Sequence, residues 1–533
     1  MEMLKFARIA ALCSVAIALP ALAQSTPAID IIFKGGTIYD GSSNTPIIGD
    51  VAIAGDKIVY IGSKAPELKS AKVRTIDARG MIVAPGFIDP HTHADRFLDS
   101  EDPNERLNLP WMKQGVTTIF AGVDGGGQTD VDSFFHDIEM RAFGSNVAAY
   151  IGFGPVRGAV LSDDGRAPNS AELERMKALV ARGMCDGALG LSTGLFYAPQ
   201  SFSKTDEVVA VAREAAVRGG VYDTHQRDES TYSIGVVDSV REAIAIGKWA
   251  GMPVHFAHIK ALGVDVHGKA DELIDIIETA RAQGQTVTAD QYPWEASGTA
   301  LEAALLPRWS VDGGRAAMLG RFASTADLER IKDAMVENIR RRGGAQSLLL
   351  TARDRAWTGK RLSEIAAEWN ITPVDAALQI ITRDGEGTSL VSFNMADADI
   401  RAFMTRPWVV TSSDGSHGHP RMYATFPQKY DQYVRKNKVI DLATFINSST
   451  GRTADIFKFD RRGHIRTGYF ADIVVFDPAA YAPVADYIEP ERLATGVSTL
   501  LVNGALVIDD GKPTGMAAGL PLRHVPPAAS CIK

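Results

Sequence analysis

The middle of the chain repeats one pattern of apolar and polar positions three times. An amphipathic helical segment ends at a glycine, a short apolar run follows, and the run ends in a polar residue: His225, His258 and Asp290 in turn. The helical segments lie at about 206–218, 239–250 and 271–283, and the apolar runs lie at 221–224, 254–257 and 286–289. Helices that alternate with buried strands predict βα units and a parallel sheet. Over residues 84–465 we expect a closed (β/α)8 barrel of the TIM type.

The two ends of the chain have a different pattern, of short strands separated by turns. We expect 30–83 and 466–525 to pair into one small β-sandwich domain, because the two ends of a domain often lie close together. Residues 300–365 are rich in charge and in helix formers and interrupt the βα rhythm. They predict an α-rich subdomain inserted in the barrel.

The N-terminus has the features of a secretory signal peptide. Lys5 and Arg8 precede an apolar run at 9–20, and 21–23 read Ala-Leu-Ala, a cleavage site of small residues. The run is shorter than the roughly 20 residues that span a bilayer, which disfavours the alternative of a membrane anchor. We expect 1–23 to be removed and the mature protein to be exported, into a bacterial periplasm.

Composition narrows the classes of function. The 533 residues are 45% hydrophobic and 23% charged, with a formal net charge of −8 and no stripe of Lys or Arg. Nucleic acids and anionic membranes need a basic surface, so we expect neither as a partner and expect a small-molecule substrate instead. After loss of the signal peptide only Cys185 and Cys531 remain, and we expect them to be free thiols.

Histidines at strand ends predict a metal site. His91 and His93 follow an apolar strand, and two residues apart on a strand means one face. His225 and His258 end strands of the repeat, and Asp414 closes another apolar run. The carboxyl ends of barrel strands meet at one rim, so these five side chains converge there if the barrel closes. Asp414 is our candidate for the general base and acid of a hydrolysis.

These stretches resemble the amidohydrolase superfamily and, within it, the D-aminoacylase (N-acyl-D-amino-acid deacylase) family. The resemblance spans about residues 30–525. Its markers are APGFIDPHTH at 84–93, QGVTT at 114–118, LSTGL at 191–195, HQRDE at 225–229, HIK at 258–260, YPW at 292–294, SDG at 413–415 and HPR at 419–421. It implies metal-dependent hydrolysis of the amide bond of N-acyl-D-amino acids or of peptides that contain D-amino acids.

The resemblance also implies how the metal is held. One zinc ion would bind His225, His258 and a ligand from the second strand, and the other three residues of the site would frame a second position. The family's second-strand ligand is a cysteine in Gly-Asn-Cys-Gly, but this chain reads Gly-Val-Asp-Gly, so Asp124 stands in its place. A carboxylate can bind zinc, and Mn²⁺ or Co²⁺ are alternatives. The other interpretation is that Asp124 only forms a turn before three glycines.

By the same resemblance, Lys260, Tyr292, Arg421 and Tyr197 are candidates for binding the carboxylate of the substrate. Three other functions stay open. They are a cyclic-amide hydrolase of the dihydroorotase or hydantoinase type, a serine hydrolase that uses Ser192 of the Gly-Leu-Ser-Thr-Gly stretch, and an exported metal-binding protein without activity.

Overall fold

The computed structural model describes residues 29–65 and 73–531. The predicted signal peptide lies outside the described residues. The predicted parallel barrel is confirmed. Only Tyr150 separates strands β8 and β9, which together occupy a single strand position of the barrel. The barrel strands are β6 (Phe87–Asp89), β7 (Val116–Ala121), β8 (Asn146–Ala149), β9 (Ile151–Gly152), β10 (Gly190–Gly194), β11 (Val221–His225), β12 (Val254–Phe256), β13 (Val287–Gln291) and β17 (Val409–Thr411). A parallel bridge between Thr92 and Gly415 closes the ring from β17 back to β6.

The helices of the predicted repeat occur where the pattern placed them. They are α7 (Thr205–Ala216), α8 (Val236–Ala250) and α9 (Ala270–Ala282). Gly251 ends α8 at φ 79°, a left-handed conformation that glycine adopts without steric cost. Gly247 lets α8 lie close against β12, since a Cβ atom there would come within 2.1 Å of Val254 Cγ2.

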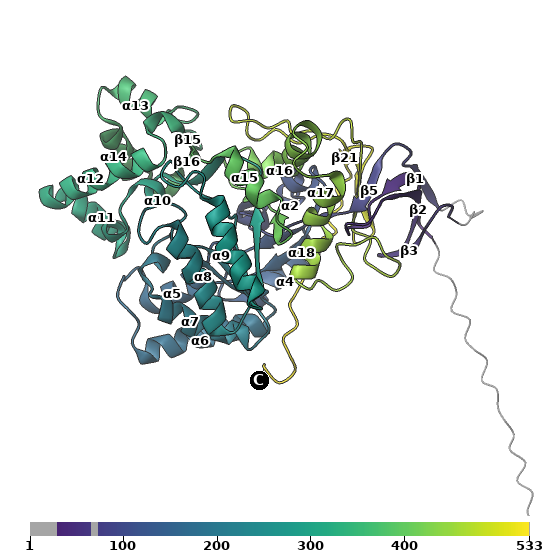
Figure 1. Ribbon diagram of the computed structural model, residues 1–533, viewed down its shortest axis with the longest axis horizontal. Helices are drawn as coiled ribbons and strands as arrows, with labels where there is room; N and C mark the ends of the chain where they lie inside the picture. Colours follow the sequence, from purple (N-terminus) through teal and green to yellow (C-terminus); the bar gives the residue numbers. More distant parts are fainter. Residues whose placement is uncertain (1–28, 66–72, 532–533) are drawn as a thin grey trace, which may run out of the picture.

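The remaining helices outside the insertion lie around the barrel strands (Figure 1). They are α1 (Asp95–Leu98), α2 (Pro103–Arg106), α3 (Leu109–Met112), α4 (Val131–Arg141), α5 (Phe153–Leu161), α6 (Ser170–Cys185), α15 (Asp397–Met404), α16 (Arg421–Lys429), α17 (Leu442–Ser449) and α18 (Gly451–Ile456).

Both chain ends build one β-sheet, as predicted. Its strand order is β21-β20-β19-β18-β5-β1-β2-β3, with β4 beside β1. The N-terminal strands are β1 (Ile31–Ile38), β2 (Ile47–Ala54), β3 (Lys57–Gly62), β4 (Arg74–Asp77) and β5 (Ile82–Pro85), and the C-terminal strands are β18 (Ile473–Phe476), β19 (Val497–Val502), β20 (Ala505–Asp509) and β21 (Lys512–Pro513). Antiparallel pairing of β18 with β5 joins the two ends. Among the described residues the pairing is therefore continuous, and the two separate sheets expected of a sandwich are not formed.

An insertion lies between β13 and β17, at the far side of the barrel from this sheet (Figure 1). Its elements are β14 (Ala296–Ala300), α10 (Leu301–Leu305), the 3-10 helix η2 (Arg308–Val311), α11 (Gly314–Ala323), α12 (Thr325–Arg341), β15 (Leu348–Ala352), α13 (Leu362–Trp369), α14 (Pro373–Asp384) and β16 (Thr388–Phe393). It has its own apolar core, which includes Leu305, Ile331 and Ile380. It extends past the predicted limit at 365. It also contains an antiparallel sheet, β14-β16-β15, that the charged helical pattern of 300–365 did not indicate.

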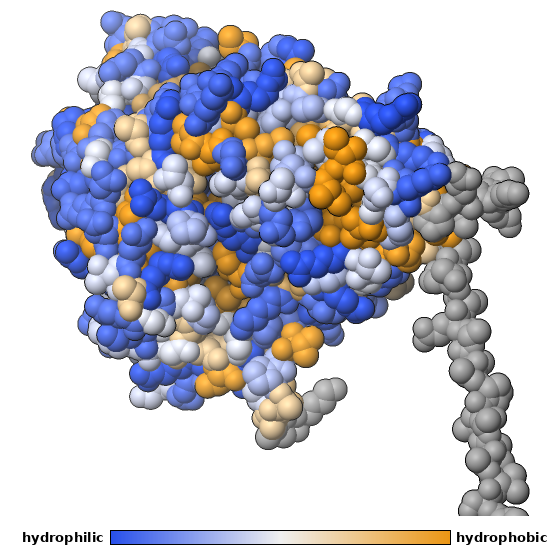
Figure 2. Space-filling view, turned by 45° about the vertical axis from the view of Figure 1, so that its right-hand side comes forward, coloured by the Kyte–Doolittle hydropathy of each residue, from blue (hydrophilic) through white to orange (hydrophobic). Residues whose placement is uncertain are grey.

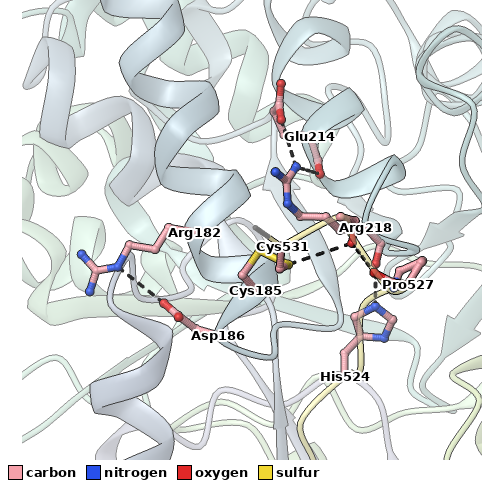
Figure 3. The surroundings of a disulfide bond; sticks show 9 residues. Arg182, Cys185, Asp186, Glu214, Arg218, His524, Pro527 and Cys531 are labelled. Atoms are coloured by element: carbon pink, nitrogen blue, oxygen red, sulfur yellow. Dashed lines mark hydrogen bonds and ion pairs between the residues drawn. A yellow bond between two sulfur atoms is a disulfide. The ribbon is translucent and has the colours of Figure 1, made fainter. Parts of the chain in front are cut away.

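Cys185 and Cys531 form a disulfide, so the expectation of free thiols is wrong. The bond joins the end of α6 to the C-terminal tail, across 346 residues of sequence (Figure 3). Backbone hydrogen bonds hold the tail along the barrel, from Leu522 N to Val147 O and from His524 N to Gly187 O, each 2.8 Å. Because 346 residues separate the two cysteines in the sequence, only the folded path of the tail brings them together.

The surface of the described part mixes polar and apolar side chains. On the face drawn in Figure 2, apolar residues gather in separate groups among hydrophilic ones. Within residues 29–65 and 73–531, no helix combines the length and the apolar character that crossing a bilayer requires.

Candidate active site

All six predicted metal ligands lie at the carboxyl ends of barrel strands. His91 and His93 follow β6, Asp124 follows β7, His225 ends β11, His258 follows β12, and Asp414 follows β17. The parallel register of the barrel places these strand ends at one rim, which is why residues so far apart in the sequence meet there.

Asp124 lies at the centre of this cluster. Its Oδ1 atom is 3.2 Å from His258 Nε2 and 3.3 Å from His91 Nε2. The same oxygen is 3.6 Å from His225 Nδ1, and Oδ2 is 3.5 Å from His93 Nε2. The structure thus surrounds this carboxylate with four imidazoles, an arrangement that a turn alone does not require.

The backbone is strained at three of these candidate ligands. Asp124, His258 and Asp414 have φ angles of 53°, 33° and 48°, in the left-handed region that non-glycine residues avoid at a cost of about 1–3 kcal/mol each. Tertiary hydrogen bonds hold two of them: His258 N donates to Asp290 Oδ1 at 2.9 Å, and Asp414 N donates to the His91 carbonyl at 2.9 Å. Such strain is typical of functional sites.

The donor set fits a divalent metal. His91 is fully buried, and neither of its ring nitrogens has a hydrogen-bond partner among the described residues. Buried polar atoms normally have hydrogen-bond partners, so the unpartnered ring nitrogens of His91 are placed as those of a metal ligand would be. Donor atoms of His91, Asp124, His258 and Asp414 all lie within 4.8 Å of one another. Burial alone raises the pKa of the Asp124 carboxyl, but the neighbouring histidines hold it well below its usual range, in the ionised form that ligation needs.

Two buried carboxylates absent from the predicted site support the histidines. Glu229 Oε1 is 3.2 Å from His258 Nδ1, and Glu229 Oε2 is 3.7 Å from His225 Nε2. Asp290 accepts hydrogen bonds from His258 N and, at 3.1 Å, from His255 Nε2. Glu229 stands four residues after His225, and Asp290 lies one residue before the end of β13. Both positions, near the end of a barrel strand, can be recognised in the sequence. Carboxylates in this position orient ligating imidazoles.

The candidate substrate ligands line a cavity of about 500 Å³ that opens over the cluster. Two of them are already ion-paired: Lys260 Nζ lies 2.7 Å from Glu229 Oε1, and Arg421 Nη1 lies 2.6 Å from Asp414 Oδ2. The ring of Tyr292 lies between them, 5.5 Å from Lys260 Nζ and 5.0 Å from Arg421 Cζ.

Tyr197 lies on the same cavity, beside His225. The two ring centroids are 4.8 Å apart, and the Tyr197 hydroxyl is 3.3 Å from Thr299 Oγ1. The four candidates thus surround the cluster of candidate metal ligands with two cations and two phenols.

Ser192 has the wrong surroundings for a nucleophile. It lies inside β10, fully buried, instead of at a turn between a strand and a helix. Its hydroxyl donates to Asp223 Oδ2 at 2.7 Å and accepts from Gly125 N at 2.9 Å. Ser192 therefore anchors the loop that carries Asp124, and the serine-hydrolase alternative is excluded.

Comparison with known proteins agrees with this geometry. A model described as "Amidohydrolase family" matches residues 74–134 and 299–508. D-aminoacylase of Alcaligenes xylosoxydans xylosoxydans is 31% identical over 92% of this chain and 96% of its own length. A solved structure of D-aminoacylase, studied for its binuclear metal centre, superposes with a TM-score of 0.78 at 30% identity, over 93% of this chain and all of the other.

N-acyl-D-glutamate deacylase of Bordetella bronchiseptica, solved with zinc and a phosphonate that mimics the tetrahedral intermediate, superposes with a TM-score of 0.79. It is 28% identical, over 93% of this chain and 99% of the other. A family model that matches half of the chain and a full-length relative above 30% identity lead to one conclusion: the chain belongs to the amidohydrolase family.

Proposed function

We propose that the protein hydrolyses the amide bond of N-acyl-D-amino acids, or of peptides that contain D-amino acids. The observation that carries this is the convergence of four histidines on Asp124 and Asp414 at the mouth of the barrel, above which a cavity opens. The names of the full-length relatives, D-aminoacylase and N-acyl-D-glutamate deacylase, support the substrate class.

We assign the six residues as ligands of one or two divalent ions, with zinc as first choice and Mn²⁺ or Co²⁺ as alternatives. His225, His258 and Asp124 would hold one ion, and His91, His93 and Asp414 would frame the other. A metal bound there lowers the pKa of a bound water and polarises the amide carbonyl.

Asp414 is the proton shuttle in this proposal. Its Oδ1 atom faces His93 Nε2 at 3.2 Å, on the side of the metal ligands, and its other oxygen faces Arg421. The carboxylate takes a proton from the attacking water and delivers it to the amide nitrogen, because an amide anion is a much poorer leaving group than an amine. Lys260, Tyr292, Arg421 and Tyr197 orient the carboxylate of the substrate.

The test is a substrate screen on zinc-loaded protein of measured metal content. Release of free amine from N-acetyl-D-amino acids, and much less from the L-enantiomers, is the expected result. Hydrolysis of hydantoins or dihydroorotate in preference to linear N-acyl amino acids would favour the cyclic-amide alternative. Turnover of none of them at full metal occupancy would contradict the proposal and leave a metal-binding protein without this activity.

We also propose that the chain is exported and that it divides into a barrel at 84–465 and a β domain from 30–83 and 466–525. The basic and apolar pattern at 1–23 supports export. The Cys185–Cys531 disulfide supports it independently, since disulfides persist in a periplasm and are reduced in a cytosol.

A further inference from the structure

The active-site cavity is larger than the smallest substrates of the proposed function require. Its volume is about 500 Å³. Cavities of roughly 300–1,000 Å³ bury drug-sized ligands, and an N-acetyl amino acid is much smaller than such a ligand. The size of the cavity therefore favours a substrate that extends beyond one amino acid and a short acyl group.

A second cavity, of about 490 Å³, adjoins the active-site cavity, and we call it the side cavity. Ala198, Val311 and Glu302 line both cavities, so these three residues lie at the boundary between them. The side cavity lies where the loop after α5 meets the insertion, since Gly313 N donates to the Asp163 carbonyl at 3.0 Å. In Figure 1, α5 lies beside the insertion helices α10 and α11.

Two of the three residues at this boundary, Ala198 and Val311, have small side chains. Bulky side chains close a neighbouring part of the wall instead. There the Phe196 ring packs edge-on against the Tyr232 ring at 5.3 Å, and Arg308 Cζ lies 3.9 Å from the centroid of Phe196. An elongated substrate that leaves the active-site cavity toward the insertion therefore meets the least bulk at Ala198 and Val311.

The segment from Gly298 to Glu302 shows how far the side cavity lies from the candidate carboxylate ligands. At its start, the Gly298 carbonyl accepts a hydrogen bond from Arg421 Nη2 at 3.3 Å. One residue later, Thr299 Oγ1 lies 3.3 Å from the Tyr197 hydroxyl, and Glu302 lies at the boundary. Two steps of β14 and two of α10 span on the order of 10 Å, the length of about three extended residues. A substrate carboxylate at Arg421 is thus about that far from the side cavity.

The side cavity is lined by charges of both signs. Three acidic and two basic residues line it: Asp163, Glu302, Asp384, Arg315 and Arg383. Glu302 Oε2 lies 4.0 Å from Arg315 Nη1, and Asp384 forms an ion pair with Arg355. Such a mixture favours neither an anion nor a cation. It offers hydrogen-bond donors and acceptors, which suit uncharged polar groups such as peptide bonds.

We propose that the side cavity binds the N-terminal part of a peptide, so that the enzyme removes a C-terminal D-amino acid from peptides of at least three residues. This inference rests on the proposed function. Arg421 and Lys260 hold the free α-carboxylate of the D-residue, and the preceding residues extend past Val311. Water adds its oxygen to the carbonyl carbon, the C–N bond breaks, and the nitrogen leaves as the amine of the D-amino acid with a proton from that water.

The kinetic experiment compares N-acetyl-D-alanine with N-acetyl-L-alanyl-L-alanyl-D-alanine in the wild type and in Val311→Trp. In the wild type, kcat/KM should be at least about tenfold higher for the peptide. Val311→Trp places an indole at the boundary and should bring that ratio close to one. Val336→Trp is the matched control and should keep the ratio, because Val336 is an exposed residue of α12 that lines neither cavity. A ratio near one in the wild type would overturn the inference.

A third substrate tests the direction in which the peptide binds. N-acetyl-D-alanyl-L-alanyl-L-alanine extends the D-residue on its carboxyl side and leaves only an acetyl group on the other. Its kcat/KM for release of acetate should be at least about tenfold lower than that of the first peptide for release of D-alanine. Faster cleavage of this third substrate would overturn the placement of the N-terminal part in the side cavity.

Calorimetry separates this inference from the proposed function. Analogues in which CH₂–NH replaces the scissile amide bond cannot be hydrolysed, so their binding does not depend on turnover. The analogue of the longer peptide should bind the zinc-loaded wild type at least about tenfold more tightly than the analogue of N-acetyl-D-alanine, and Val311→Trp should lose that difference.

Equal binding of the two analogues by the wild type, or a difference that Val311→Trp retains, would overturn the role of the side cavity whatever the turnover. A preference for the longer analogue that is lost in Val311→Trp, without turnover of any N-acyl amino acid or peptide, would support the side cavity as a peptide site and contradict the proposed function.

Discussion

Arg421 and Asp414 form a buried ion pair, with Arg421 Nη1 2.6 Å from Asp414 Oδ2. Arg421 Nη2 also donates to Ser416 Oγ at 2.8 Å, while its Nε atom has no partner among the described residues. The residue expected to bind the substrate thus also holds the proposed proton shuttle, and a substrate carboxylate at this position would have to share the guanidinium with Asp414.

Asp414→Asn should fold and retain tightly bound metal but lower kcat by at least about 100-fold, the scale of a lost general acid and base. Steady-state kinetics with metal analysis of the same sample measure both effects. A decrease of less than tenfold with metal retained would assign the proton transfer to another group.

Arg421→Met should raise KM, since a cation that binds the substrate carboxylate is lost, and should also lower kcat, since Asp414 loses the partner that holds it. Arg421→Lys should show smaller changes in both KM and kcat than Arg421→Met. An unchanged kcat in Arg421→Met would show that the ion pair does not position Asp414, and equal kinetics of the wild type on substrates with and without the α-carboxylate would refute the binding role.

Asp124→Ala should lose at least one equivalent of metal, because Asp124 is central to the histidine cluster. Asp124→Cys should retain zinc and lose its response to Mn²⁺, since a thiolate is a softer ligand than a carboxylate. Metal analysis by mass spectrometry and zinc–Mn²⁺ competition give the readouts. An unchanged number of metal ions per protein in Asp124→Ala would show that this residue only forms a turn.

Loss of the disulfide should destabilise the folded protein by about 2–4 kcal/mol, because the bond closes a long loop. Denaturant unfolding of Cys185→Ser and Cys531→Ser measures it. The double variant should be no less stable than either single variant, since all three lose one bond. Additive losses would mean that the two cysteines act separately.

The exported protein should begin at or near Gln24, directly after the small residues at 21–23. N-terminal sequencing of protein from the periplasmic fraction tests this prediction. Exported protein that still begins with Met1 would contradict cleavage.

The sequence by itself determined the barrel, the location of its rim and the histidines that meet there. These features depend on local patterns: helix and strand periodicity, glycines at helix ends, and a polar residue directly after each strand. His91, His93, His225 and His258 were identifiable because a strand end is a local feature and a parallel barrel brings all strand ends together. The common sheet of the two chain ends followed from the same kind of pattern.

Only the tertiary structure decided which charges are paired and which are not. In the sequence, Lys260 and Arg421 look like any charged residues near a site, but the structure pairs Lys260 with Glu229 and Arg421 with Asp414. Cys185 and Cys531 looked like unrelated thiols for the same reason. Ion pairs and disulfides depend on distances of a few ångströms between segments far apart in the chain, and those distances are set by the packing of helices and insertions, which no local pattern encodes.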